Sequence, residues 1–217
     1  MEIVCISASN TPNMGENSTS TRVCELIKKI AISESPASET EVIPLMNQRI
    51  KFCMLCGDCS EDGLCPYDND FNDIYTKLKE ADVCFFVVPH YTPIPSKLLA
   101  VFEKINEILY AQSIHIPQFQ SPFLNKHAAV IGHGGSAENK ETLRHYHDSL
   151  ITPVASTLSS FGFSIVGFNE EFPLGAPFGL KDETCVQPSE SSVFPEIIQS
   201  WRLIESRIRP LVLKALK

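Results

Sequence analysis

Short apolar runs alternate with longer segments of helical periodicity along the chain. The runs that predict β-strands lie at residues 2–7, 41–45, 83–89, 127–133 and 163–168. Apolar residues recur with a helical period at residues 17–33, 70–81, 95–112, 140–161 and 191–215. Alternation of strand and helix is typical of a parallel sheet covered by helices, so we expect an α/β fold with a doubly wound sheet of five strands.

Two local features refine this expectation. Residues 83–89 are apolar throughout, as in a strand that is buried on both faces of a sheet. Pro153 falls inside the fourth helical segment and predicts a kink there. Because no linker composition divides the chain, we expect residues 1–217 to form a single domain.

Three longer segments have neither period and lie at residues 46–69, 113–126 and 169–190. Loops of this length in a compact domain are usually functional or poorly ordered. In an open α/β sheet, ligands bind beyond the carboxyl ends of the strands. The turns after residues 7, 89 and 133 should therefore line one crevice, where we expect a cofactor site.

Composition restricts the classes of function. The chain has 217 residues, 43% of them hydrophobic and 20% charged, which suits a folded core and excludes a disordered or collagen-like protein. With 18 Lys and Arg against 26 Asp and Glu, the formal net charge of -8 argues against binding to nucleic acid. The sequence has no signal-peptide pattern, and no apolar run approaches the roughly 18 residues of a membrane span. We expect a soluble, cytoplasmic protein that acts neither on nucleic acid nor in a membrane.

A hydroxyl-rich turn follows the first strand. Residues 7–21 contain many Ser and Thr side chains and lead directly into a helix. Helix N-termini present unpaired N–H groups, and hydroxyls add neutral donors, so together they can hold the phosphate of flavin mononucleotide (FMN). The glycine-rich motifs of dinucleotide and nucleoside-triphosphate sites are absent from the sequence. A plainer interpretation is that Asn17 or Ser18 caps the helix, which is compatible with phosphate binding.

The turns after the third and fourth strands contain Pro89-His90-Tyr91-Thr92 and Gly134-Gly135-Ser136. An aromatic ring can cover a flat flavin, and glycine backbone can approach the polar edge of its ring. Each turn alone is equally well explained as an ordinary connection between strand and helix. Their expected convergence with the first turn favours a flavin site. His90 and His133 flank this crevice and could hydrogen-bond to the flavin, although a satisfied or solvated histidine is the plainer interpretation.

Four of the eight cysteines lie close together, as Cys53-x2-Cys56-x2-Cys59-x5-Cys65 followed by Pro66. Without a signal peptide, such a group indicates metal binding or redox chemistry rather than disulfides. Short spacers let successive sulfurs converge, and the longer last spacer lets the fourth close the site, as an iron–sulfur cluster requires. Structural zinc usually takes two separated pairs of ligands, so the pattern favours a [4Fe-4S] cluster over zinc or free thiols.

These features together resemble the iron–sulfur flavoproteins of the flavodoxin-like superfamily, which are relatives of NAD(P)H-dependent FMN reductases. The resemblance rests on the four-cysteine motif, the acidic helix start Asp68-Asn69-Asp70-Phe71, Ala81-Asp82, the buried strand after it and the turn Pro89-His90-Tyr91. It implies a flavodoxin-like sheet with strand order 2-1-3-4-5, helices on both faces, and a cysteine-rich, cluster-binding insertion over residues 46–69.

Together with the turns described above, the resemblance predicts the residues of the site. The predicted contacts to FMN come from Ser9, Asn17, Ser18, Thr19, Pro89, His90, Tyr91, Thr92, Gly134, Gly135 and Ser136. Two positions depart from the family pattern, since Thr11 stands where an Arg is common and Pro93-Ile94 stands where Gly-Asn is usual. Because proline lacks an N–H, flavin contacts in that turn should differ from those of the family.

The favoured function is FMN-dependent electron transfer, in which the cluster passes electrons between a one-electron donor and the flavin. No catalytic protein nucleophile is expected, because the cofactors carry the chemistry. The resemblance implies a ferredoxin-like or NAD(P)H electron donor, a small-molecule acceptor such as oxygen, peroxide or a quinone, and a homo-oligomer. Two alternatives stay open: an NAD(P)H-dependent FMN or quinone reductase without a cluster, and a non-enzymatic interaction module stabilised by zinc.

Overall fold

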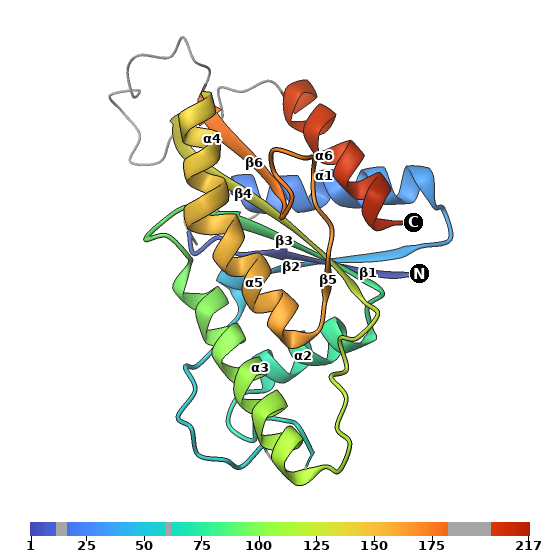
Figure 1. The fold of residues 1–217 in the computed structure, drawn as a ribbon, viewed down its shortest axis with the longest axis vertical. Helices are drawn as coiled ribbons and strands as arrows, with labels where there is room; N and C mark the ends of the chain where they lie inside the picture. Colours follow the sequence, from blue (N-terminus) through green and yellow to red (C-terminus); the bar gives the residue numbers. More distant parts are fainter. Residues whose placement is uncertain (12–16, 60–61, 182–200) are drawn as a thin grey trace.

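The computed structural model describes residues 1–11, 17–59, 62–181 and 201–217 (Figure 1). The strands are β1 (Glu2–Ser7), β2 (Glu39–Pro44), β3 (Val83–Pro89), β4 (His127–Ala137), β5 (Ser164–Ile165) and β6 (Ala176–Lys181). The α-helices are α1 (Thr19–Glu34), α2 (Asn69–Glu80), α3 (Ser96–His115), α4 (Lys140–Tyr146), α5 (Thr152–Phe161) and α6 (Trp201–Ala215). Two short segments of other helical type are η2 (Leu45–Asn47), a 3-10 turn, and η3 (His147–Ile151), a π-helix.

The strands form one parallel sheet with the order β2-β1-β3-β4-β5, and β6 also pairs with β4. This confirms the 2-1-3-4-5 order of a flavodoxin-like fold. β3 lies at the centre of the sheet, and all of its residues are buried, as its continuous apolar run predicts. The turns that follow β1, β3 and β4 therefore leave the sheet from the same edge.

The outer edge of β4 differs from the prediction. The sequence predicts one strand at residues 163–168, but β5 has only two residues and pairs with the start of β4. Residues 176–181 are expected to be irregular, yet they form β6 and pair with β4 from Ile131 to Ala137. Pro177 and Gly179 are residues that normally weaken a strand, so the sequence of β6 gives little sign of it. Two short strands thus share the fifth position of the sheet.

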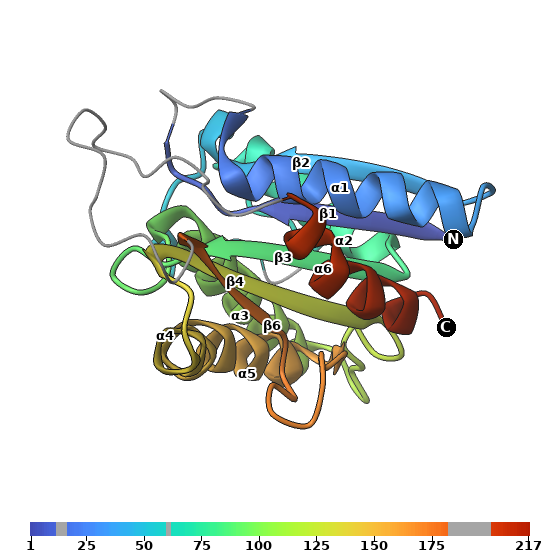
Figure 2. The same cartoon turned by 90° about the horizontal axis from the view of Figure 1, so that it is seen from above.

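Helices cover both faces of the sheet (Figures 1 and 2). α1 and α6 lie on one face, and α2, α3 and α5 lie on the other. Successive residues of β3 alternate between the two cores: Phe85 packs with residues of α1 and α6, whereas Phe86 packs with residues of α2, α3 and α5. A strand that is apolar at every position is needed because it serves both cores.

The first three predicted helices correspond to α1, α2 and α3. The fourth predicted helix is α4, η3 and α5 in succession, so the kink expected at Pro153 appears as a π turn just before it. Pro153 has no N–H to offer the Ser149 carbonyl, which favours a wider turn there. Of the last predicted helix, residues 191–200 lie outside the described residues, and α6 forms the rest. None of the described helices is long and apolar enough to cross a membrane.

Candidate functional site

The turns after β1 and β3 meet at the carboxyl edge of the sheet. The hydroxyl of Ser9 lies 3.3 Å from the hydroxyl of Tyr91, and the backbone N–H of Asn10 donates to the same Tyr91 oxygen at 3.4 Å. Ser9 also shares a hydrogen bond of 2.7 Å with Thr11. The Asn10 side chain donates to Ser96 at the start of α3 at 3.2 Å. The structure therefore brings the predicted residues Ser9 and Tyr91 together, with Asn10 beside them.

Asn10 was not among the residues singled out from the sequence. Its side-chain oxygen Oδ1 is buried and has no hydrogen-bond partner within the described residues. An unpaired buried acceptor costs about 1–3 kcal/mol, so a ligand that brings a donor here gains affinity. The ring N–H and the ribityl hydroxyls of FMN are donors of this kind, and this edge of the sheet therefore fits the cofactor.

The start of α1 shows how the predicted phosphate-binding residues are used. The Ser18 hydroxyl accepts from the Thr21 N–H at 3.3 Å and donates to the Thr21 hydroxyl at 2.9 Å, which confirms that Ser18 caps the helix. Thr21 also shares a hydrogen bond of 2.8 Å with Ser7 in β1, so the helix start is tied to the sheet. Asn17 is exposed and Thr19 half-exposed at this same end. Their contacts with a phosphate stay predictions.

The segment Gly134-Gly135-Ser136 is not a loop, because β4 continues to Ala137 alongside β6. Gly134 is buried against Tyr146, and a Cβ atom at this position would overlap the Tyr146 hydroxyl oxygen. The backbone N–H of Ser136 donates to that same oxygen at 3.1 Å. Gly134 is thus required by packing, and the Ser136 N–H already has a partner within the chain. Gly135 is half-buried and Ser136 is exposed, and flavin contacts from all three stay predictions.

His90 lies at the edge of the predicted crevice, just after the buried Pro89 that ends β3. Its ring packs 5.1 Å from the ring of His145 and 5.4 Å from that of Tyr146. Burial and the nearby His145 lower the pKa of His90, so its neutral form is favoured. Thr92 is exposed on the turn beside it.

His133 lies deeper than its place in the sequence suggests. It is only 3% exposed, its Nε2 atom is 2.8 Å from the Ser20 hydroxyl, and its ring stacks on Phe178 with centroids 5.1 Å apart. Burial lowers the pKa of His133 to about 3. The ring is therefore a neutral part of the packing between α1, β4 and β6.

The cysteine-rich segment is closed into a loop by the start of α2. Asp68 caps α2 by accepting from the Phe71 N–H at 3.1 Å, and it also accepts from the Lys51 N–H at 2.8 Å. Asp70 accepts from the Arg49 N–H at 2.6 Å. The acidic helix start noticed in the sequence thus joins the two ends of the loop.

Two further side chains hold the backbone of this loop. Asn72 of α2 accepts from the Cys65 N–H and donates to the Cys65 carbonyl, both at 2.8 Å. Lys97 of α3 donates to three backbone carbonyls where the loop begins. These acceptors, at distances from 2.8 to 3.0 Å, are the carbonyl oxygens of Leu45, Met46 and Gln48. The loop is therefore anchored to both α2 and α3.

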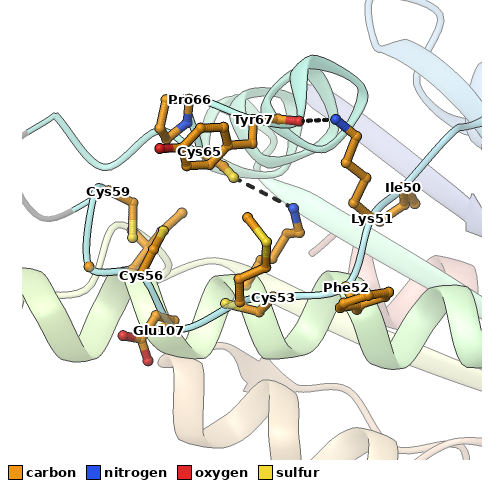
Figure 3. A pocket seen from close by; sticks show the side chains of 14 residues that line it. Ile50, Lys51, Phe52, Cys53, Cys56, Cys59, Cys65, Pro66, Tyr67 and Glu107 are labelled. Carbon is orange, nitrogen blue, oxygen red and sulfur yellow. Dashed lines mark hydrogen bonds between the residues drawn. The ribbon is translucent and has the colours of Figure 1, made fainter.

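A cavity of about 370 Å³ lies between this loop and α3 (Figure 3). The four cysteines of the motif all line it, namely Cys53, Cys56, Cys59 and Cys65. α3 contributes Lys104, Glu107 and Ile108 from successive turns of one face. The structure therefore brings all four predicted ligands to one place.

The thiols differ in their surroundings. Burial raises the pKa of Cys59, and the charge of Glu107 and the neighbouring thiols adds to this effect, while a backbone hydrogen bond opposes it. Cys53 accepts from the Leu55 N–H at 3.5 Å, across a tight turn in which Leu55 has a positive φ of 51°. The Cys65 sulfur lies 3.6 Å from the ammonium of Lys104. Donor groups, one from the loop backbone and one from α3, thus already contact two of the four sulfurs.

The donor set suits a metal cluster, although the sulfurs are not in ligating positions. All four thiols are free, and they surround one cavity. Within the described ranges, no three His, Cys, Asp or Glu side chains lie close enough together to hold a metal ion. Of the other cysteines, Cys5, Cys24 and Cys84 are buried in the cores, and Cys185 lies outside the described residues.

α3 connects the two candidate sites. Its first residue, Ser96, contacts Asn10 beside the turns at the sheet edge, and Lys104 lies in the wall of the cysteine cavity. Eight residues of α-helix separate them, which corresponds to about 12 Å along the axis. The sequence pattern alone does not single out Lys104 as a site residue, although it lies on the apolar stripe formed by Val101, Ile105 and Ile108. A charge at such a position indicates a buried ion pair.

Similarity to known proteins extends over most of the chain. Residues 1–170 match the family model described as NADPH-dependent FMN reductase. The chain is 27% identical to an iron–sulfur flavoprotein of Methanosarcina thermophila over 177 residues, which are 79% of this chain and 80% of that protein. An iron–sulfur flavoprotein of Methanocaldococcus jannaschii is 35% identical over 91 residues, which are 42% of this chain and 44% of that protein.

Among solved structures, RosB with bound 8-demethyl-8-formylriboflavin-5'-phosphate has a similar fold. The TM-score is 0.62 at 15% sequence identity, and the match covers 99% of this chain and 77% of that one. The resemblance to iron–sulfur flavoproteins that the sequence indicates is confirmed by these relatives.

Proposed function

The chain belongs to the NADPH-dependent FMN reductase family, and from this premise we propose that it is an electron-transfer enzyme that couples FMN to a [4Fe-4S] cluster. That it is a flavin-dependent oxidoreductase follows from the family. The observation that carries the cluster is the placement of all four motif cysteines around one cavity. When bound, FMN supplies one- and two-electron chemistry and the cluster supplies one-electron exchange.

The residues at the sheet edge would bind and orient the flavin. The N-terminus of α1, with Asn17, Ser18 and Thr19, offers N–H groups and hydroxyls to a phosphate. Tyr91 is held in place by Ser9 and by the Asn10 N–H, which supports a fixed ring position beside the cofactor. The unpaired Asn10 oxygen offers an acceptor for a flavin donor.

The cysteine loop would hold iron through Cys53, Cys56, Cys59 and Cys65. The four thiols are free and line a common cavity. The two ends of the loop are anchored by hydrogen bonds to the start of α2 and to α3. The loop therefore supplies the ligands, and the two helices supply the rigid support.

The electron donor, acceptor and assembly are part of the same proposal. The family match supports NAD(P)H as a donor, and a one-electron cluster supports a ferredoxin-like donor, with a small molecule as the acceptor.

Tyr110 and Ile114 expose 61% and 60% of their surface on α3, which supports association into a homo-oligomer. Stopped-flow reduction by NADPH or by reduced ferredoxin, and light scattering after gel filtration, test these points. The cytoplasmic location expected from the sequence stays a prediction.

A second candidate is an NAD(P)H-dependent FMN or quinone reductase without a cluster. The observation in its favour is that, in the described part of the chain, no three His, Cys, Asp or Glu side chains lie close enough together to hold a metal ion. In that enzyme the cysteines would be free or bind zinc. Binding of zinc without flavin would instead support the non-enzymatic interaction module.

Purification without oxygen separates these candidates. The proposed enzyme yields a brown protein with one flavin and about four iron and four sulfide per chain. A yellow protein without iron would support the reductase without a cluster. A colourless protein with zinc and no flavin would contradict both enzyme assignments.

Substitution of one proposed ligand tests the site directly. We expect Cys56→Ser to lose the broad absorbance and most of the iron of the cluster, because a hydroxyl is a poor ligand for iron, while the flavin bands persist. The matched control is Cys24→Ala, since Cys24 is buried in the core on the opposite face of the sheet. Unchanged iron in Cys56→Ser, or equal loss in both variants, would contradict the ligand assignment.

A further inference from the structure

Lys104 is a buried charge beside one of the proposed ligands. Its side chain is 3% exposed, and its ammonium lies 2.7 Å from Asp68 and 3.6 Å from the sulfur of Cys65. The ammonium also lies 5.2 Å from the centre of the Phe71 ring. Lysine is rarely buried unless it is paired, and here the pairing directs the ammonium into the wall of the cysteine cavity.

Asp68 holds this ammonium in place from the other side. Its side chain is 2% exposed. Burial opposes the charge of Asp68, but hydrogen bonds from Lys104 and from the N–H groups of Lys51 and Phe71 outweigh it and lower the pKa of Asp68. The carboxylate is therefore a fixed counter-charge, and Lys104 cannot turn away toward solvent without leaving it unpaired.

A positive charge next to a ligand sulfur favours the addition of negative charge at the cluster. Each electron that a one-electron donor delivers to the cluster adds one negative charge, and no bond or proton is needed to balance the step. A nearby ammonium stabilises the more negative, reduced state, because buried charges are weakly screened. Hydrogen bonds to the sulfurs and local charge are known determinants of the potential of such clusters.

We propose that Lys104 is a positioning residue that raises the reduction potential of the cluster through its contact with Cys65, with Asp68 setting the size of this effect. This inference rests on the proposed function, because it requires that the four cysteines hold a cluster. It predicts shifts of opposite sign for the two members of the ion pair. If Lys104 and Asp68 only supported the fold, both substitutions would weaken cluster retention, and the potential would not shift in opposite directions.

The test is a redox titration of the purified, iron-loaded protein, followed by electron paramagnetic resonance and visible absorbance. At a fixed applied potential, we expect Lys104→Met to lower the ratio of reduced to oxidised cluster about tenfold, which corresponds to ~59 mV for one electron. Lys104→Arg keeps the charge and should stay within about threefold of the wild type, which is at most about half of the ~59 mV of a tenfold change. Asp68→Asn removes the counter-charge and should raise the ratio, and Asn is itself a good helix cap.

Lys77→Met of α2 is the control, because the Lys77 ammonium forms a partly exposed ion pair with Glu41 of β2 and does not hold the cysteine loop. We expect it to leave the iron content and the potential unchanged. Equal ratios in Lys104→Met and the wild type, or shifts of the same sign in Lys104→Met and Asp68→Asn, would overturn the proposal. If Lys104→Met does not retain iron, the sign of the shift in Asp68→Asn decides.

The iron and sulfide content of the wild type separates this inference from the proposed function. A wild-type protein without a cluster overturns both. A normal cluster whose potential ignores Lys104 and Asp68 overturns this inference alone and leaves the proposed function intact.

Discussion

His133 is a titratable side chain enclosed between the sheet and α1. Its only hydrogen bond within the described residues joins Nε2 to Ser20, and its Nδ1 atom is buried without a partner. Burial lowers its pKa to about 3, from an ordinary value of 6.5. The folded protein therefore keeps His133 neutral over a pH range in which the unfolded chain takes up a proton.

This difference makes stability depend on pH in a defined direction. The contribution of neutral His133 is fully present above pH 6.5 and is lost as the pH falls toward 3, because only the unfolded state binds the proton. Between pH 6.5 and pH 5, this effect lowers the free energy of unfolding by about 2 kcal/mol. We expect His133→Gln, which keeps a polar group near Ser20, to lose less stability than the wild type on this change.

Urea unfolding of both proteins at about pH 7.5 and about pH 5 measures the difference. An equal loss of stability in His133→Gln and in the wild type would show that His133 is not responsible. Because His90 also has a lowered pKa, only the difference between the variant and the wild type isolates His133.

The end of β4 is held by close packing between this strand and α4. Gly134 pairs with Gly179 of β6 on one side and packs under the Tyr146 ring of α4. The Tyr146 hydroxyl accepts from the Ser136 N–H, so the helix completes the hydrogen bonding of the strand. A side chain at Gly134 would separate α4 from β4.

We expect Gly134→Ala to destabilise the protein by about 1–3 kcal/mol, because the added methyl overlaps the buried Tyr146 ring. Ser136→Ala is the control, since Ser136 is exposed and keeps its N–H, and it should change stability by less than about 0.5 kcal/mol. Thermal unfolding of both variants without flavin tests this. Equal stability of the two variants would mean that α4 shifts at little cost.

The cysteine loop is an insertion in a fold whose hydrophobic cores are formed mainly by the sheet and the helices. The sheet packs against α1 and α6 on one face and against α2, α3 and α5 on the other. Of the four motif cysteines, Cys59 belongs to a core, Cys65 packs against the same core, and Cys56 is exposed. Iron bound by the loop should therefore stabilise the protein without being required for its fold.

Removal of iron by an anaerobic chelator tests this separation. We expect the far-ultraviolet circular dichroism to persist and the thermal midpoint to fall, because a group that binds only the folded state stabilises it. Chelator treatment of Cys56→Ser is the control and should change neither quantity. Loss of the helical spectrum together with the iron would show that the loop and the sheet fold as one unit.

Much of the fold is predictable because its signals are local. The apolar runs of β1 and β3 and the helical periods of α1 to α3 lie within single segments, so the order of elements follows from short-range pattern. The spacing of Cys53, Cys56, Cys59 and Cys65 likewise lies within one loop, and the structure places all four around one cavity. These features depend only on how often apolar side chains recur and on the number of residues between them.

The remaining features depend on contacts between distant residues, which no local pattern encodes. β6 is a strand because β4 offers it unpaired backbone groups, although Pro177 and Gly179 disfavour it. Gly134 is a packing residue because Tyr146 lies over it. Lys104 meets Asp68 and Cys65 only after α3 has docked against the loop, since 36 and 39 positions separate them in the chain. The charge of Lys104 lies beside the thiols only in the packed molecule. No single segment of the sequence therefore predicts it.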